Sequence, residues 1–182
     1  MGLDPTPPTL RRPRALEVIP IGGVLVGIFD LLFAFIFYGF FLKAPALRIF
    51  QNVAGGLLGR QSAIEGGLRT FFLGIVLHFL VATCIATVYY LVSLVFPLAL
   101  RHAVPSGLVY GMIAYLGMNY IVIPLSALGP RTTSKRAWVF AVEIIGHAVL
   151  VGLPLALLAR RSAKIHSSRS DNFGAATPET VS

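Results

Sequence analysis

The sequence predicts an all-α integral membrane protein, with four transmembrane helices in a bundle and a short interfacial amphipathic helix between the first two. Of its 182 residues, 56% are hydrophobic and only 12% are charged, with a mean hydropathy of +0.81, unlike the balance of a soluble domain. Four apolar runs each reach the ~20 residues that cross a bilayer. None of the fifteen Lys and Arg residues lies inside those runs.

Residues 1–17 hold four prolines and an arginine cluster, which predicts a disordered basic tail held at the lipid surface. The apolar run that follows extends over 18–42. It exceeds the ~7 to 15 residues of a signal-peptide core, so it predicts a retained first span, at about 19–42, within a membrane domain of residues 18–161.

Asp30 lies at the centre of the first span. Helical spacing places small residues and one tyrosine on its face: Gly23, Gly27, Ala34 and Tyr38. Small residues allow helices to approach closely, so Asp30 should point toward protein rather than lipid.

The segment between Lys43 and Arg69 is too polar to span. Its apolar residues recur at helical spacing and predict the interfacial helix: Leu47, Phe50, Val53 and Leu57. The second span, about 71–96, carries His78. Small residues and a tyrosine share that histidine's face: Gly74, Ala82, Ala86 and Tyr89.

The third span, about 105–127, places Tyr115 and Asn119 one turn apart. Pro124 cannot donate a backbone hydrogen bond, so it should leave the carbonyl of Tyr120 available to another partner.

The fourth span, about 137–159, contains Glu143 and His147, one turn apart on one face. The basic, serine-rich stretch 162–182 predicts a disordered C-terminal tail. Ionisable residues at membrane depth are costly and mark functional sites by default. Glu143 and His147 are therefore the strongest candidates, together with His78.

Depth along the helices places the polar residues in one half of the bilayer, because the first and third spans end on the face where the second and fourth begin. At 1.5 Å per residue they lie about 9–18 Å below that face. The members of this layer come from all four spans: Asp30, His78, Asn119, Glu143 and His147. Tyr115, one turn from Asn119, is a further candidate. Because the polar residues share one half of the bilayer, the fourth span should face His78, with Asn119 and Asp30 nearby.

Several spaced motifs add a family resemblance: His78, Tyr89 eleven positions later, Phe96-Pro97, Ile123-Pro124-Leu125 with Gly129-Pro130, and Glu143-Ile144-Ile145-Gly146-His147. This set resembles the YagU-type inner-membrane proteins of bacteria, over about residues 74–158. The resemblance implies a multi-pass protein of the bacterial inner membrane and brings no established activity. His78, Glu143 and His147 match the family pattern, whereas Asn119 departs from it, since a relative has histidine there.

Three functions fit this layer, and no enzyme motif accompanies it, so we expect a non-enzyme. In the first, imidazole and carboxylate groups handle protons or a small ion. In the second, His78, Glu143 and His147 hold a transition metal, or two histidines hold a haem. In the third, the protein is an accessory subunit of a membrane complex, and the polar groups only tie helices together.

The expected partners follow from composition. Lipid surrounds the spans, and the juxtamembrane Lys and Arg residues suit anionic head groups. Because four spans are few for a transporter, we expect a homodimer or a larger partner. The basic residues are scattered over tails and loops, which argues against nucleic acid. They divide almost evenly between the two membrane sides, and the small excess favours cytoplasmic termini.

Overall fold

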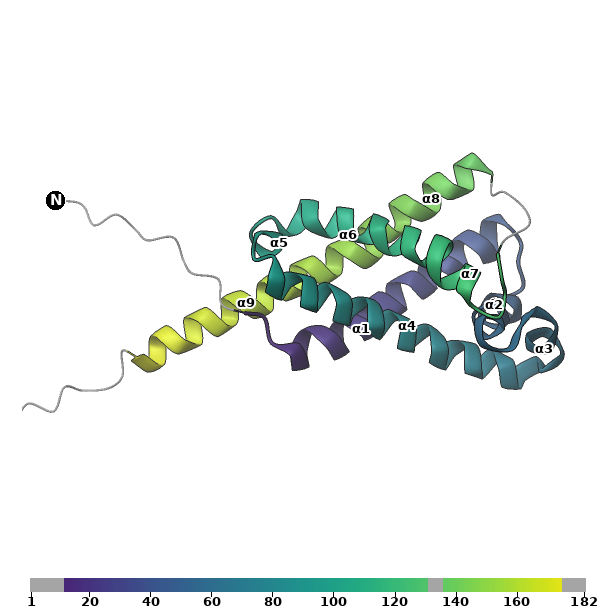
Figure 1. The fold of residues 1–182 in the computed structure, drawn as a ribbon, viewed down its shortest axis with the longest axis horizontal. Helices are drawn as coiled ribbons and strands as arrows, with labels where there is room; N and C mark the ends of the chain where they lie inside the picture. The colour runs from purple at the N-terminus through teal and green to yellow at the C-terminus, as the bar shows by residue number, and fades with distance from the viewer. Residues whose placement is uncertain (1–11, 131–135, 175–182) are drawn as a thin grey trace, which may run out of the picture.

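The computed structural model describes residues 12–130 and 136–174, with the backbone alone for 164–174. Within these ranges the regular structure is helical (Figure 1). Four helical stretches are long and apolar enough to cross a membrane: Ala15–Phe41, Gly67–Val95, Ala103–Leu125 and Ala137–Ala163. The predicted fold class is confirmed, including short helices between the first two spans.

Several spans consist of more than one helical segment. The first comprises α1 (Ala15–Ala34) and the π-helical η1 (Phe35–Phe41), and the second is α4 (Gly67–Val95). The third comprises α6 (Ala103–Gly117), η2 (Met118–Val122) and α7 (Ile123–Leu125). The fourth comprises α8 (Ala137–His147), η3 (Ala148–Gly152) and α9 (Leu153–Gly174). The short α5 (Leu98–Arg101) connects the second span to the third.

Both tail predictions are wrong at their inner ends. The first helix begins at Ala15, inside the tail predicted for 1–17, and α9 continues to Gly174 although disorder was predicted from residue 162. No proline or glycine lies between Pro154 and Gly174, so nothing in that sequence stops the backbone hydrogen bonds from propagating. Residues 1–11 and 175–182, also predicted to be disordered, lie outside the described part of the chain.

The predicted interfacial helix is divided into α2 (Ala46–Leu58) and α3 (Arg60–Glu65). Gly59 separates them at a φ of +81°, a conformation that glycine adopts readily. Leu47 and Leu57 of the predicted apolar face are exposed, whereas Phe50, Gln51, Ala54 and Gly55 are buried. A Cβ on Gly74 of α4 would lie 2.1 Å from the carbonyl oxygen of Phe50, so α2 lies directly against that span.

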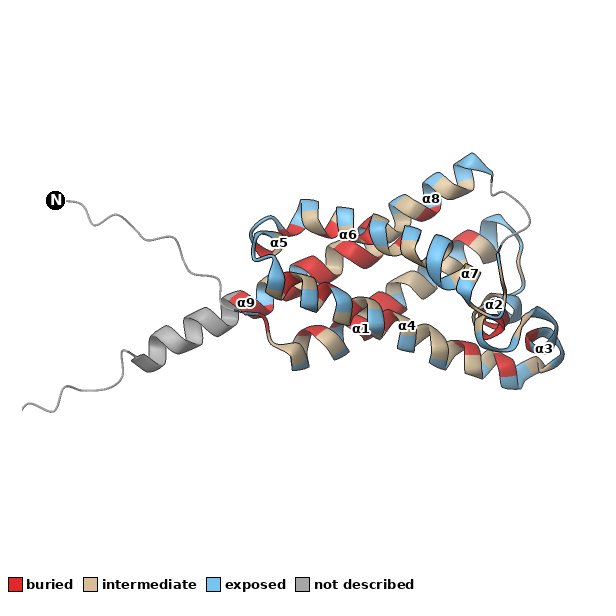
Figure 2. Cartoon of the chain, viewed as in Figure 1, coloured by how far each residue is buried: buried red, intermediate tan, exposed pale blue. Residues whose placement is uncertain are grey.

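Large apolar residues are exposed on all four spans. Figure 2 shows exposed positions along the outward faces of the helices. Ile21, Val76, Ile113 and Ile145 are examples, each more than half exposed. Lipid tails are as apolar as these side chains, so their exposure suits a bilayer and provides no drive for helix association. Association must then come from close packing and polar contacts between the helices.

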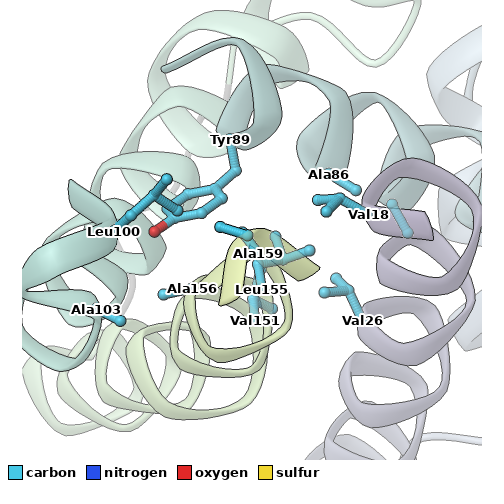
Figure 3. Close-up of a cluster of buried hydrophobic side chains, with 12 residues drawn as sticks. Val18, Val26, Ala86, Tyr89, Leu100, Ala103, Val151, Leu155, Ala156 and Ala159 are labelled. Carbon is cyan, nitrogen blue, oxygen red and sulfur yellow. The ribbon is translucent and has the colours of Figure 1, made fainter. Parts of the chain in front are cut away.

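One half of the bundle, next to α5 and the start of α9, is densely packed. Figure 3 shows that α1, α4 and the fourth span meet there through mostly small or branched side chains. Its twelve buried residues include Val18 and Val26 of α1, Ala86 of α4 and Leu155 of α9. The face predicted to share the side of His78 on α4 is confirmed as a packing face. Its small residues and tyrosine are buried: Gly74, Ala82, Ala86 and Tyr89.

The third and fourth spans touch backbone to backbone. A Cβ on Gly111 would lie 2.3 Å from the carbonyl oxygen of His147, and one on Gly152 would lie 1.9 Å from that of Gly107. Such distances leave no room for a side chain, so only glycine permits this approach. This contact determines how close the polar side chains of α6 and α8 can come to each other.

Wide π-helical turns precede two prolines. The η2 turn ends immediately before Ile123-Pro124, and η3 ends immediately before Leu153-Pro154. The peptide N–H groups of Ile123 and Leu153 each donate to a carbonyl five residues earlier. Since proline lacks an N–H and its ring obstructs the preceding turn, a wide turn accommodates it without breaking the helix.

Candidate functional site

Glu143 is the most deeply buried acid in the described chain, with a relative exposure of 2%. The hydroxyl of Tyr115 donates a 2.5 Å hydrogen bond to its Oε2, and the hydroxyl of Tyr38 donates to its Oε1. These groups come from three spans: η1, α6 and α8. Two donated bonds, one to each oxygen, match an ionised carboxylate, whose oxygens only accept. Glu143 therefore joins three helices through one carboxylate.

The backbone contact at Gly111 explains why Tyr115 reaches Glu143. Tyr115 follows Gly111 by one helical turn, and His147 follows Glu143 by one turn. Because Gly111 lies against the His147 main chain, the helices converge at that level. The ring of Tyr115 then lies 5.0 Å from that of His147, centroid to centroid, and is only 2% exposed.

His147 makes two contacts that determine where its hydrogen lies. Its Nδ1 is 2.9 Å from the main-chain oxygen of Glu143, and its Nε2 is 3.5 Å from Oδ1 of Asp30. Because a carbonyl oxygen can only accept, Nδ1 carries a hydrogen. A neutral ring would therefore turn a lone pair at Nε2 toward the carboxyl group of Asp30.

A single proton between Asp30 and His147 would make their contact favourable. Either Asp30 is protonated beside a neutral ring, or an imidazolium faces an ionised carboxylate. In both arrangements the pair is neutral overall. Without that proton, an ionised carboxylate would face the lone pair of a neutral ring, which is electrostatically unfavourable. Asp30 and His147 are partly exposed, at 27% and 20% of their side chains, so this proton borders open space.

His78 contacts the first span rather than the fourth. Its Nε2 lies 2.9 Å from the main-chain oxygen of Gly27, one turn before Asp30, so Nε2 carries the hydrogen. We predicted that the fourth span would face His78. The structure instead engages His78 with α1, because the glycine face of α1 lies against α4 at Gly23 and Gly27.

Asn119 makes a local contact, in which its side-chain amide donates a 2.9 Å hydrogen bond to the carbonyl oxygen of Tyr115 on the same span. This is one turn back along the helix, and the following residues form the wide turn η2. The amide thus satisfies a backbone carbonyl just before the helix widens.

A cavity of about 1110 Å³ occupies the half of the bundle opposite the packed core. All six predicted polar candidates line it: Asp30, His78, Tyr115, Asn119, Glu143 and His147. The segment 126–130 and α2 also line it, and they are joined by a 2.9 Å bond from the Ala127 N–H to the Gly56 oxygen. Spans and connecting segments together therefore surround one partly open, largely apolar cavity that contains these polar residues.

Two lining residues were missed as site candidates. Tyr38 was placed on the face of Asp30, and its spacing was the available signal, but its bond to Glu143 was not foreseen. Arg60, at the start of α3, lines the cavity beside α2. Its sequence position in a polar connecting segment gave no sign that it would approach the spans.

The predicted metal site is not assembled. Among the residues that the structure describes, no three His, Cys, Asp or Glu side chains lie close enough to hold a metal ion. The physical reason is visible in the contacts. The Nε2 of His78 engages Gly27, and tyrosine hydroxyls occupy both carboxylate oxygens of Glu143.

Fold and cavity together define a multi-pass helical membrane protein with one packed half and one half that contains a largely apolar cavity with a few ionisable residues. No family model, curated protein or solved structure matches the chain.

Proposed function

We propose that the protein binds and releases protons in the cavity as a step in transport across the membrane. The observation that supports this most strongly is the 3.5 Å contact between Oδ1 of Asp30 and Nε2 of His147, two groups that can exchange a proton and that line the cavity. Intramembrane carboxylates and imidazoles that face a cavity are the usual components of proton pathways. Imidazoles as a class exchange protons near neutral pH.

The packing of the two halves also favours this function. A structural tie between helices needs no open volume beside it, whereas a carrier must let protons or solutes reach its buried groups. The cavity of about 1110 Å³ provides that volume around Asp30 and His147. We therefore prefer transport to a purely structural role as an accessory subunit.

We also propose that the chain is a YagU-type protein of the bacterial inner membrane with cytoplasmic termini, and that it is not an enzyme. Support comes from the spaced motif that joins His78 to Glu143-Ile144-Ile145-Gly146-His147. The residues of that motif line the cavity at His78, Glu143 and His147. The resemblance adds no activity, so the proton function depends on the cavity alone.

Asp30→Asn is expected to reduce proton movement to the rate of empty vesicles. Asparagine keeps the size of the side chain but removes the group that gains or loses a proton. The measurement is the decay of an imposed pH gradient across proteoliposomes, followed with an entrapped pH-sensitive dye. Wild-type protein should accelerate the decay.

Glu65→Gln is the matched control, because Glu65 is an exposed acid on α3 bonded to the side chain of Gln61. It should conduct like the wild type. Equal decay for the wild type and Asp30→Asn, with both proteins inserted and monodisperse, would count against proton transport. It would favour the accessory role.

A further inference from the structure

The size and lining of the cavity restrict what else can bind there. A hard inorganic cation takes six or more oxygen ligands, and among the described residues no three His, Cys, Asp or Glu side chains are grouped to contribute to such a shell. The volume of about 1110 Å³ is instead that of a site for a drug-sized organic molecule. The occupant should therefore be larger than an ion and partly apolar.

Aromatic residues line the cavity that Asp30 borders. Phe33 of α1 and Tyr38 of η1 are partly exposed, whereas Phe50 of α2 and Tyr115 of α6 are each only 2% exposed. Phe33 also stacks on Phe37, with ring centroids 5.5 Å apart. Ring faces attract cations, and more strongly where water is excluded. An organic cation would thus find both a carboxylate and aromatic walls.

The charged and titratable groups described around the cavity come from six of the helical segments that line it: Asp30 (α1), Tyr38 (η1), Arg60 (α3), His78 (α4), Tyr115 (α6), Glu143 and His147 (α8). Glu143 is 2% exposed and engaged by two tyrosines, so it is not the accessible acid. Asp30, whose side chain is 27% exposed, is the accessible acid. Arg60 lies on α3, in the segment that connects the first two spans. Asp30 lies inside the first span, about 16 Å along the helix from Phe41, the last residue of that span.

We propose that the cavity binds an amphipathic organic cation, a protonated amine or quaternary ammonium, at Asp30, and that this cation replaces the proton shared with His147. Before binding, Asp30 and His147 hold one proton. On binding, the cation pairs with the Asp30 carboxylate, His147 remains neutral with its hydrogen on Nδ1, and the proton leaves to water. Charge balances, since one cation enters as one proton leaves.

This exchange rests on the proposed function and gives it a substrate class. It would make the protein an exchanger in which proton and organic cation compete for one carboxylate. Competition of this kind links the binding of the two ligands, because both cannot occupy Asp30 together.

The test compares two probes of the same size and shape but opposite charge: tetraphenylphosphonium and tetraphenylborate. Equilibrium dialysis against the purified full-length protein should show saturable binding of the phosphonium and none of the borate. In weakly buffered solution, about one proton should be released for each phosphonium bound. Asp30→Asn should weaken phosphonium binding by at least about ten-fold, because the paired charge is lost.

Two further variants keep this test decisive. Asp30→Glu retains the charge and should bind the phosphonium more tightly than Asp30→Asn, and Glu65→Gln should bind like the wild type. Saturable borate binding, or phosphonium binding without proton release or without dependence on residue 30, would overturn the exchange. If Asp30-dependent proton flux persists while the phosphonium does not bind, only the substrate class fails. If neither depends on Asp30, the proposed function fails with it.

Discussion

Gly111→Val is expected to prevent the third and fourth spans from packing, with a loss of about 3 kcal/mol or more in stability. The Cβ of any residue at this position would lie 2.3 Å from the His147 carbonyl oxygen and 2.6 Å from the Ala148 Cα, both main-chain atoms. Main chain cannot rotate away as a side chain can. The protein should lose its thermal transition in detergent or fail to accumulate in membranes.

Gly117→Ala, near the end of the same helix, is the matched control. No atom lies within 4 Å of a Cβ built there, so the change should be neutral or stabilising by up to about 1 kcal/mol. Equal melting temperatures for Gly111→Val and Gly117→Ala would show that the two spans do not meet at Gly111.

Tyr115 and Glu143 are expected to show a coupling energy of about 1–2 kcal/mol in a double-mutant cycle of Tyr115→Phe and Glu143→Ala. A hydrogen bond to a charged group contributes about 1.5–3 kcal/mol in water-soluble proteins, and interhelical bonds in membranes reach at most about 1.7 kcal/mol. The cycle isolates the bond because the cost of the cavity left by alanine cancels. Unfolding in mixed micelles, followed by circular dichroism, gives the four free energies.

Tyr120 provides the control for this cycle, since it lies on the same span but is 67% exposed. Tyr120→Phe with Glu143→Ala should give a coupling near zero. A coupling near zero for Tyr115 as well would mean that its hydroxyl does not bind Glu143 in the folded protein.

The four spans could be predicted from sequence because hydropathy over ~20 residues is a local property. The same holds for the convergence of the polar residues in one half, since depth along a helix follows from counting residues. His78 of the second span and Glu143 and His147 of the fourth line one cavity, as their depths suggested. The glycine faces around Gly23, Gly27 and Gly74 were correctly predicted as packing surfaces.

Side-chain partners were harder to predict, because they depend on rotation of one helix about its axis relative to another. Counting residues gives depth but not direction, so His78 was expected to face the fourth span, whereas it binds the oxygen of Gly27. The π-helical turns add to the difficulty. Tyr38 lies in η1, where the wider turn shifts side chains away from the 3.6-residue spacing used to place them.

The packing of the polar segment between the first two spans could not be predicted from apolar spacing either. The apolar spacing in α2 predicted a lipid-facing helix through Leu47 and Leu57, and these residues are indeed exposed. It did not predict that Gln51 would be buried against α3 and α4, where its amide donates to the main-chain oxygens of Ile64 and Gly67. Hydrogen bonds to backbone allow a polar residue to be buried where periodicity predicts exposure.

The proton shared by Asp30 and His147 is the central claim, and ¹⁵N NMR of histidine-labelled protein tests it most directly. His147→Gln identifies the resonances of His147. They should show a hydrogen on Nδ1 throughout, as the bond to the Glu143 carbonyl requires, and Asp30→Asn should shift the Nε2 resonance of His147 and leave that of the exposed His102 unchanged. A neutral His147 with its hydrogen on Nε2, or an Nε2 resonance insensitive to residue 30, would contradict the claim.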